Sequence, residues 1–310
     1  MGKVSVVFPG QGSQYVGMGK DFYDSFIESK TIFEKVDNTL KYKLSDIIFN
    51  GTEDELKITY NTQPALLTVS MVIWEFAKEK IKPDFFAGHS LGEYSAIVAA
   101  GGMSLEDAAL AVHNRGKFMQ EAVPVGTGAM AAVLSMDESV VLETCREISR
   151  EGFIVEPANF NSDAQIVVAG HADAVNAFIE KLKEKGGRKI VKLPVSAPFH
   201  CSLMKPAEIK MAQYLDGVQI RNLHTPVFNN VYADKEISSE DVKRALIEQV
   251  SSAVKWTSLV KNMISEGVDT FIEVGAGNVL TGLIKKIDKN VRCYNVSTVK
   301  DLETLGGYLV

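Results

Sequence analysis

Cysteine is scarce in this sequence, with only Cys145, Cys201 and Cys293 among 310 residues. They are odd in number, lie far apart and form no CxxC pair, which argues against a disulfide framework and favours a reducing, cytoplasmic setting. No HExxH motif is present either, and we expect no metal site. No apolar run approaches the ~20 residues of a membrane span, and Val4–Phe8 is too short for the core of a signal peptide, so we expect no membrane association.

The sequence also has no excess of basic residues. The chain has 33 Lys and Arg against 39 Asp and Glu, a net charge of −6 at pH 7, so nucleic acid has no general electrostatic reason to bind. The 46% of hydrophobic residues and 23% of charged residues are typical of a globular protein. The length fits two average domains or one α/β unit with an inserted lobe.

Short apolar strands alternate with helical patterns in most of the chain, which predicts an α/β fold with a mainly parallel sheet covered by helices. Residues 127–196 have the order βαββαβ, the ferredoxin-like motif. We therefore expect a discontinuous, hydrolase-like large domain of residues 1–126 and 197–310, interrupted by a small subdomain of residues 127–196. The expected elements include helices over 21–40 and 64–80, and strands over 188–196 and 225–231.

The segment Gly88–Gly92 reads GHSLG and fits G-x-S-x-G, the nucleophile elbow. Such a turn from strand to helix needs glycines, because side chains at either flank would collide with backbone. It would expose the hydroxyl of Ser90 beside a helix N-terminus and leave the amide of Leu91 free to stabilise an oxyanion. The alternative is an ordinary strand-to-helix turn with a capping serine.

A catalytic serine needs a base. Among five histidines, His200 is the best candidate, because Pro198 fixes the backbone where the predicted insertion rejoins the large domain. The alternative is a histidine of a surface loop. His89 adjoins the serine but should point away from it and support the loop.

Arg115 interrupts an apolar helical stripe that includes Val112 and Met119. Burial of a guanidinium is costly unless it meets an anion. One explanation is a structural salt bridge; the other is a bidentate clamp for a substrate carboxylate, for which arginine is better suited than lysine.

The loop Pro9–Gln14 contains two glycines but fits no nucleotide-binding motif, since Tyr15 and Met18 stand where a glycine and a lysine would be required. The backbone N–H of Gln11 could instead complete an oxyanion hole. A flexible turn is the alternative.

Five separated motifs, in their order along the chain, resemble those of malonyl-CoA:acyl-carrier-protein transacylases. The resemblance covers essentially the whole chain. The motifs are Gly10–Gln14, Gly88–Tyr94, Arg115, Ser196–His200 and Glu273–Gly275. The chain departs from the family at Ala276-Gly277, where Pro-Gly is frequent; this should change loop stiffness more than chemistry.

The resemblance implies roles for individual residues. Ser90 would be the acylated nucleophile and His200 its general base and later acid, with the amides of Gln11 and Leu91 as the oxyanion hole. Arg115 would hold the malonyl carboxylate, and the backbone carbonyl of Gln249 would orient the histidine. The remaining positions expected to bind substrate are Gln63, His89, Met119, Asn159 and Phe199. In related acyltransferases a phenylalanine at the position of Phe199 goes with malonyl units.

The implied reaction is ping-pong transfer of a malonyl group from malonyl-CoA to the phosphopantetheine thiol of acyl carrier protein, in fatty-acid synthesis, by a cytoplasmic monomer. Coenzyme A thioester and phosphopantetheine would be substrates, and we expect no bound cofactor. The alternatives are a serine hydrolase (thioesterase or esterase), a polyketide-pathway acyltransferase, and a non-enzymatic carrier-binding scaffold. Carrier proteins are acidic, so a basic surface should dock them. The candidate basic runs are residues 181–192 and 285–292.

Overall fold

The computed structural model describes residues 2–124, 126–195 and 197–305. Met1 and residues 306–310, at the ends of the predicted large domain, lie outside the described residues. So does Ser196, the last residue of the predicted subdomain and the first of the Ser196–His200 motif.

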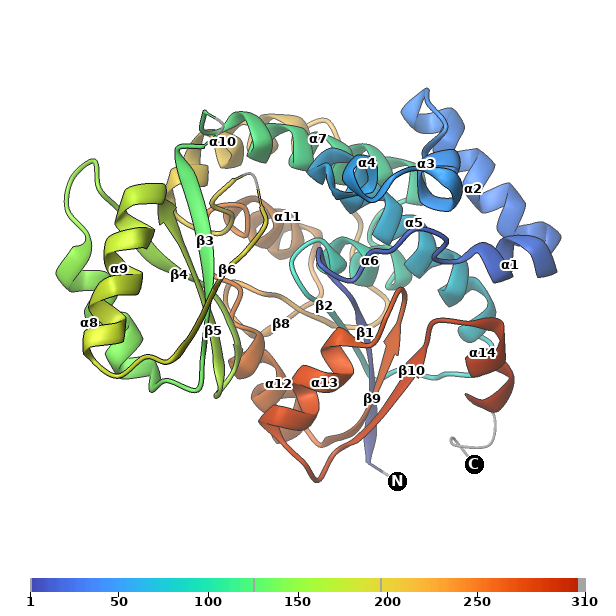
Figure 1. Cartoon of the computed structure of the whole chain (residues 1–310). Helices are drawn as coiled ribbons and strands as arrows, with labels where there is room; N and C mark the ends of the chain where they lie inside the picture. The colour runs from blue at the N-terminus through green and yellow to red at the C-terminus, as the bar shows by residue number, and fades with distance from the viewer. Residues whose placement is uncertain (1, 125, 196, 306–310) are drawn as a thin grey trace.

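A six-stranded sheet forms the centre of the larger part of the molecule (Figure 1). Its strands, in spatial order, are β10 (Arg292–Val296), β9 (Val268–Val274), β1 (Lys3–Phe8), β2 (Phe85–Gly88), β7 (Val227–Phe228) and β8 (Lys235–Glu236). All neighbours are parallel except β7 and β8. This is the mainly parallel α/β sheet predicted from the apolar strands.

Helices cover both faces of this sheet because successive side chains of a buried strand point to opposite sides. On β1, Val6 and Phe8 join a core with α5 and α7, whereas Val7 joins a second core with α12 and α13. The helices of this part are α1 (Lys20–Ser25), α2 (Ile27–Leu40), α3 (Leu44–Asn50), α4 (Glu53–Lys57), α5 (Thr59–Ala77), α6 (Gly92–Ala99), α7 (Leu105–Glu121), η1 (Ser202–Met204), α10 (Lys205–Leu215), α11 (Ser239–Glu248), α12 (Trp256–Ser265), α13 (Val279–Ile287) and α14 (Val299–Leu305).

A separate four-stranded antiparallel sheet lies to one side, with α8 (Glu138–Ile148) and α9 (Ala172–Glu184) on its outer face (Figure 1). Its order is β4 (Val155–Ser162), β5 (Gln165–His171), β3 (Gly128–Leu134) and β6 (Lys189–Lys192). It has its own core, in which Val168 and Phe178 are fully buried. The division into two domains at residues 126 and 197, and the ferredoxin-like assignment, stay predictions.

Three predicted elements are shorter or divided in the structure. The predicted helix over 21–40 divides at Phe26, which is extended (φ −131°, ψ 132°). The predicted strand over 188–196 is reduced to β6, which ends before Pro194, a residue without the N–H that a sheet requires. The predicted strand over 225–231 is reduced to β7, because the chain turns after Phe228 and the amide of Ala233 donates to the carbonyl of Asn229.

Helix α5 begins at Thr59 rather than at Pro64, where the predicted helix began. A proline inside a helix leaves the carbonyl four residues earlier without its usual donor, here the carbonyl of Tyr60. The Nδ1 atom of His113, on α7, lies 2.9 Å from this oxygen and donates to it. A side chain of the neighbouring helix therefore replaces the hydrogen bond that Pro64 cannot make.

Candidate active site

The strand-to-helix turn at Ser90 stands at the carboxyl edge of the large sheet. Phe8, the last residue of β1, is in register with Gly88, the last residue of β2, so the loops that follow the two strands emerge side by side. In open parallel sheets this edge is where ligands bind. The loop after β1 carries Gln11 and the turn after β2 carries Ser90, which explains why these two distant motifs line one pocket.

The two glycines of the turn are required by close backbone contacts. A Cβ atom at Gly88 would lie 1.9 Å from the backbone of Gly92, and one at Gly92 would lie 2.2 Å from the carbonyl oxygen of Phe8. Ser90 itself has φ 55°, in the left-handed region that residues other than glycine seldom adopt. Strain of this kind is frequent at functional sites, where the surrounding structure maintains it.

His200 lies directly against the serine hydroxyl, with its Nε2 atom 2.7 Å from Ser90 Oγ. Its Nδ1 atom lies 3.0 Å from the carbonyl oxygen of Gln249. A carbonyl can only accept, so Nδ1 carries the proton and Nε2 presents its lone pair to the serine. Burial and the charge of Arg115 lower the pKa of His200 to about 3, which keeps the ring neutral at neutral pH. The histidine is therefore arranged to accept the proton of Ser90.

Arg115 is buried, and its hydrogen-bond partners are two side-chain amides and the hydroxyl of Ser90. Nη1 donates to Gln63 Oε1 at 2.7 Å, and Nη2 donates to Gln249 Oε1 at 2.8 Å and to Ser90 Oγ at 3.1 Å. Within the described residues no carboxylate forms an ion pair with Arg115, and its Nε atom has no partner. The structural salt bridge considered from the sequence is not among its contacts. A buried guanidinium whose hydrogen-bond partners are all neutral is suited to an incoming anion.

Two residues that line the same cavity have backbone N–H groups without a partner in the described part of the chain. The two are Gln11 and Leu91. Leu91 is also the N-cap residue of α6, where the helix dipole favours negative charge. The pair is therefore available to an oxyanion that develops beside Ser90.

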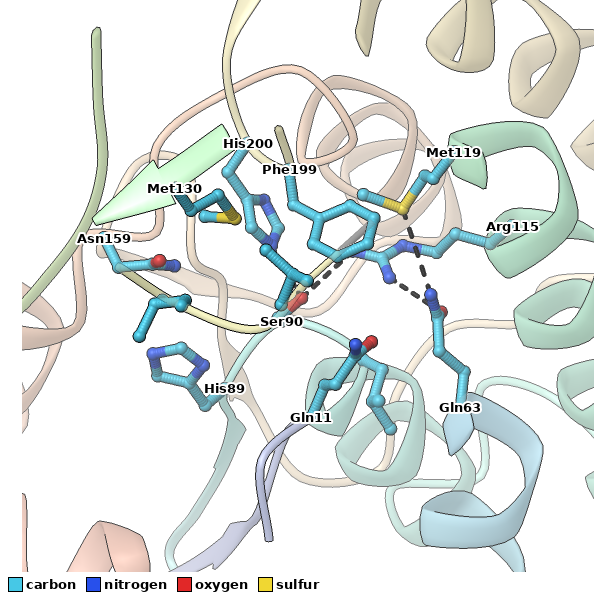
Figure 2. A pocket seen from close by; sticks show the side chains of 13 residues that line it. Gln11, Gln63, His89, Ser90, Arg115, Met119, Met130, Asn159, Phe199 and His200 are labelled. Carbon is cyan, nitrogen blue, oxygen red and sulfur yellow. Dashed lines mark hydrogen bonds between the residues drawn. The ribbon is translucent and has the colours of Figure 1, made fainter. Parts of the chain in front are cut away.

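His89 points away from the serine hydroxyl, as expected, and lies at the other side of the pocket (Figure 2). Its Nε2 atom is 2.8 Å from Asn161 Oδ1, and its ring lies 5.6 Å from that of Trp256. Burial lowers the pKa of His89, so it is neutral as well. Sequence reasoning missed Asn161, because its partner His89 lies 72 residues away in the chain.

All the residues predicted to form the site are together in the structure. The cavity has a volume of about 100 Å³ and is lined by Gln11, Gln63, His89, Ser90, Leu91, Arg115, Met119, Met130, Asn159, Leu193, Val195, Phe199 and His200. Gln249 lies directly behind the lining, in contact with His200, Arg115 and Ser90. Sequence reasoning missed Met130, Leu193 and Val195, which have no feature that distinguishes them from core residues.

Two of the positions expected to bind substrate, Phe199 and Met119, lie beside Arg115 in Figure 2. Met119 Sδ accepts a weak hydrogen bond from Gln63 Nε2 at 3.9 Å. Cys201, beside the histidine, donates its Sγ–H to the carbonyl of Pro198, and burial raises the pKa of its thiol to about 12. It is an inert, structural thiol.

Neither a metal cluster nor a membrane-spanning helix is found among the residues that the structure describes. No group of three or more His, Cys, Asp or Glu side chains is placed to hold a metal ion. No helix in this part of the chain has the length and apolar character needed to cross a membrane.

Residues 6–308 match the family model described as "Acyl transferase domain". The chain is 47% identical over 304 residues to a malonyl CoA-acyl carrier protein transacylase of Bacillus subtilis (98% of this chain, 96% of the relative) and 42% identical to that of Staphylococcus aureus (98% of each). A crystal structure of an acyl carrier protein S-malonyltransferase from Vibrio cholerae superposes with a TM-score of 0.95 at 41% identity (98% of this chain, 99% of that chain).

A second solved structure contains a type II PKS acyl-carrier protein in complex with its malonyl-transacylase; it matches with a TM-score of 0.96 at 41% identity, over 99% of both chains. The family model and the relatives each cover nearly the whole chain, and the solved structures have the same α/β fold. The chain therefore belongs to the family of malonyl CoA-acyl carrier protein transacylases and is an acyltransferase.

Proposed function

We propose that this enzyme transfers a malonyl group from malonyl-CoA to the phosphopantetheine thiol of acyl carrier protein, in fatty-acid synthesis, through a malonyl ester of Ser90. One observation carries the proposal: Ser90 Oγ is within hydrogen-bonding distance of both His200 Nε2 (2.7 Å) and Arg115 Nη2 (3.1 Å). A base for the hydroxyl and a cation for a carboxylate thus meet at one oxygen atom.

In the first half of the reaction, Ser90 Oγ attacks the thioester carbonyl and its proton passes to His200 Nε2. The amides of Gln11 and Leu91 stabilise the oxyanion of the tetrahedral intermediate. When the intermediate collapses, the C–S bond breaks, the proton moves from His200 to the departing sulfur, and free coenzyme A leaves. In the second half the thiol of the carrier gives its proton to His200 and its sulfur attacks the ester carbonyl. The C–O bond to Ser90 then breaks, His200 returns the proton to Ser90 Oγ, and the malonyl thioester of the carrier leaves. No cofactor takes part in either step.

Arg115 supplies the selectivity for an acyl group that ends in a carboxylate. In malonyl the carboxylate carbon is two carbons beyond the carbonyl carbon, so an ester on Ser90 would place it within reach of a guanidinium that already contacts Oγ. On acylation the guanidinium would exchange its contact with Ser90 for the carboxylate, while Gln63 and Gln249 retain the other hydrogen bonds. Orientation of this kind can lower a barrier by several kcal/mol, on the order of 7 or more in favourable cases.

Intact-protein mass spectrometry tests the proposal. The enzyme is incubated with malonyl-CoA, first alone and then with phosphopantetheinylated carrier protein. We expect a stable increase of one malonyl group that maps to Ser90, is absent from Ser90→Ala, and is discharged onto the carrier. Rapid release of free malonate would support the hydrolase alternative, and no adduct would support a scaffold.

The same assay, run with a fatty-acid carrier and with a polyketide carrier, tests which of the two pathways the enzyme serves. The solved complex with a type II PKS carrier keeps a polyketide acceptor as the second candidate. Faster discharge onto a fatty-acid carrier than onto a polyketide carrier is the expected result. The cytoplasmic location and the monomeric state predicted from the sequence also belong to this proposal; size-exclusion chromatography with light scattering tests the second.

The carrier is expected to dock at the strand β6. Of the basic run 181–192, Lys181 and Lys183 on α9 pair with glutamates of the same helix. Lys185, the residue after α9, pairs with Glu147, with its Nζ atom 2.7 Å from Oε1. Lys189 and Lys192 are exposed and have no ion pair within the described residues. The chain passes directly from β6 into Leu193 and Val195, which line the cavity. A carrier held at β6 would thus be close to the entrance of the site.

A further inference from the structure

Asn230 holds the turn that carries Ser90, from a segment 140 residues away in the chain. It follows β7 and is fully buried. Its side-chain Oδ1 accepts from the backbone N–H of Ser90 at 2.6 Å, and its Nδ2 donates to the carbonyl of Gly88 at 2.7 Å. One amide group therefore binds the two backbone groups that flank the bend.

The main chain of Asn230 is held in turn by the helix that follows the serine. Its backbone N–H donates to Glu93 Oε2 at 2.7 Å, and Glu93, on α6, is fully buried as well. Asn230 and the segment from Gly88 to Glu93 thus fix each other through three hydrogen bonds. Gln249 completes the arrangement from the opposite side, since its Nε2 atom donates to the carbonyl of Ser90 at 3.0 Å.

This arrangement matches the unusual backbone of the serine. Ser90 has φ 55°, a conformation that surrounding contacts must maintain. The direction of its Oγ atom toward His200 and Arg115 depends on that conformation. The amide of Asn230 supplies both an acceptor for the N–H of Ser90 and a donor for the carbonyl of Gly88, whatever the pH. An aspartate has the same shape but no donor when it is ionised.

We infer that Asn230 is a positioning residue for the acyl-transfer reaction: it fixes the backbone of Ser90 so that the hydroxyl faces His200 and the adjacent oxyanion amides. The inference rests on the proposed function of Ser90 as the nucleophile. The role inferred for Asn230 differs from that of Arg115, because Asn230 acts on the nucleophile and would make no contact with the acyl chain. Loss of Asn230 should slow acylation by any acyl group, whether or not it carries a carboxylate.

Asn229 provides a matched control. It is the adjacent residue, of the same type, 3% exposed, and its side chain makes three hydrogen bonds, where that of Asn230 makes two. Its partners are Asp234, Glu236 and Tyr232, none of which belongs to the turn at Ser90. Substitution of Asn229 should therefore lower the stability of this region without a direct effect on the serine.

The test measures single-turnover acylation by rapid quench and mass spectrometry, with malonyl-CoA and with acetyl-CoA, for the wild type, Asn230→Ala, Asn230→Asp, Asn229→Ala and Asn229→Asp. Rates are taken per folded molecule, with the folded fraction determined by circular dichroism. We expect both Asn230 variants to acylate about 100-fold more slowly with either thioester, as for a reacting group displaced by about 1 Å, with an unchanged KM for malonyl-CoA. The Asn229 variants should acylate at the wild-type rate.

Two results would overturn the inference: an Asn230 variant that acylates at the wild-type rate, or equal losses in the Asn229 and Asn230 variants. Asn230→Asp keeps the shape of the side chain, so it serves if Asn230→Ala does not fold. If the wild type itself forms no ester at Ser90, the proposed function fails, and that outcome is distinct from both.

Discussion

Arg115 Nη2 lies 3.1 Å from Ser90 Oγ and 2.8 Å from Gln249 Oε1. One nitrogen atom of the cation therefore donates both to the candidate nucleophile and to an amide. A carboxylate bound to this guanidinium would replace a weak, neutral acceptor by a charged one. The selectivity of the enzyme then follows from the free energy of that exchange.

Arg115→Ala should impair malonyl transfer far more than acetyl transfer. Loss of a charge-assisted hydrogen-bond pair corresponds to about 3 kcal/mol, or about 100-fold in kcat/KM for malonyl-CoA. Acetyl-CoA has no carboxylate and should lose little. Steady-state kinetics with both thioesters measures the ratio. Lys117→Ala removes an exposed charge from the same helix and should leave the ratio unchanged. Equal losses for the two thioesters would contradict the clamp.

Gln63→Glu should stabilise the free enzyme and weaken malonyl binding. The variant keeps an acceptor at the position that Arg115 Nη1 contacts at 2.7 Å but adds a negative charge there. The guanidinium would then have an internal partner that competes with the substrate carboxylate. We expect a higher melting temperature without ligand and a KM for malonyl-CoA raised about 10-fold, equivalent to about 1.4 kcal/mol.

Gln63→Leu is the matching variant without an acceptor, and it should lower the melting temperature, because Arg115 loses a partner. If Gln63→Glu lowers the KM for malonyl-CoA, the proposed role of Arg115 is wrong.

The pH dependence of activity should differ between the free and the loaded enzyme. In the free enzyme the pKa of His200 is lowered to about 3 by burial first and by the charge of Arg115 second. The profile of kcat/KM, which reports the free enzyme, should therefore stay flat on the acid side well below pH 6.5. A bound malonyl carboxylate neutralises Arg115, so the kcat profile should turn down at a higher pH. An acid limb of kcat/KM near pH 6.5 would contradict this.

The same shift predicts how stability varies with pH. Between pH 3 and 6.5 the unfolded chain protonates His200 while the folded protein does not, so the free energy of unfolding falls as the pH falls through this window. His200→Gln should remove this part of the slope, at most about 1.4 kcal/mol per pH unit. Urea denaturation of both proteins at several pH values measures the difference. The contributions of other groups, such as Glu93, whose pKa is raised by burial, cancel in this comparison.

Charge reversal on β6 should raise the KM for carrier protein and leave the KM for malonyl-CoA unchanged. Lys189→Glu with Lys192→Glu should raise the KM for carrier protein about 10-fold, an effect that weakens as salt is added. Lys286→Glu with Lys289→Glu, in the other basic run, is the control. A larger effect from the control pair would assign docking to the end of α13 and the loop that follows it.

The turn at Ser90 and the unusual position of Arg115 could be predicted from the sequence, because both depend on residues that are close together in the chain. Gly88 and Gly92 are needed by the turn itself, and Arg115 stands out because a charge on an apolar helical stripe is visible in a single helix. Asn230 and Asn161 could not be found in this way. Their partners are 72 to 142 residues away, and only the folded chain brings them together.

The fold was predictable where strands and helices are long and regular. The alternation of buried strands with helices was sufficient for the parallel sheet. The short elements α3, α4 and β8 have too few residues to show a period, and the two-residue strand β7 is fixed by pairing with β2. The break at Phe26 has no glycine or proline to mark it.

Helices α5 and α7 touch backbone to backbone at Gly116, where a Cβ atom would lie 2.7 Å from Tyr60 Cα, and His113 joins them by its bond to the carbonyl of Tyr60. Gln63 and Arg115 therefore stand on two helices that are fixed to each other, whereas Leu193 and Phe199 of the pocket wall come from other segments. An engineer who wishes to load bulkier dicarboxylic building blocks can reshape Leu193 or Phe199, since the anchor for the distal acid would keep its place.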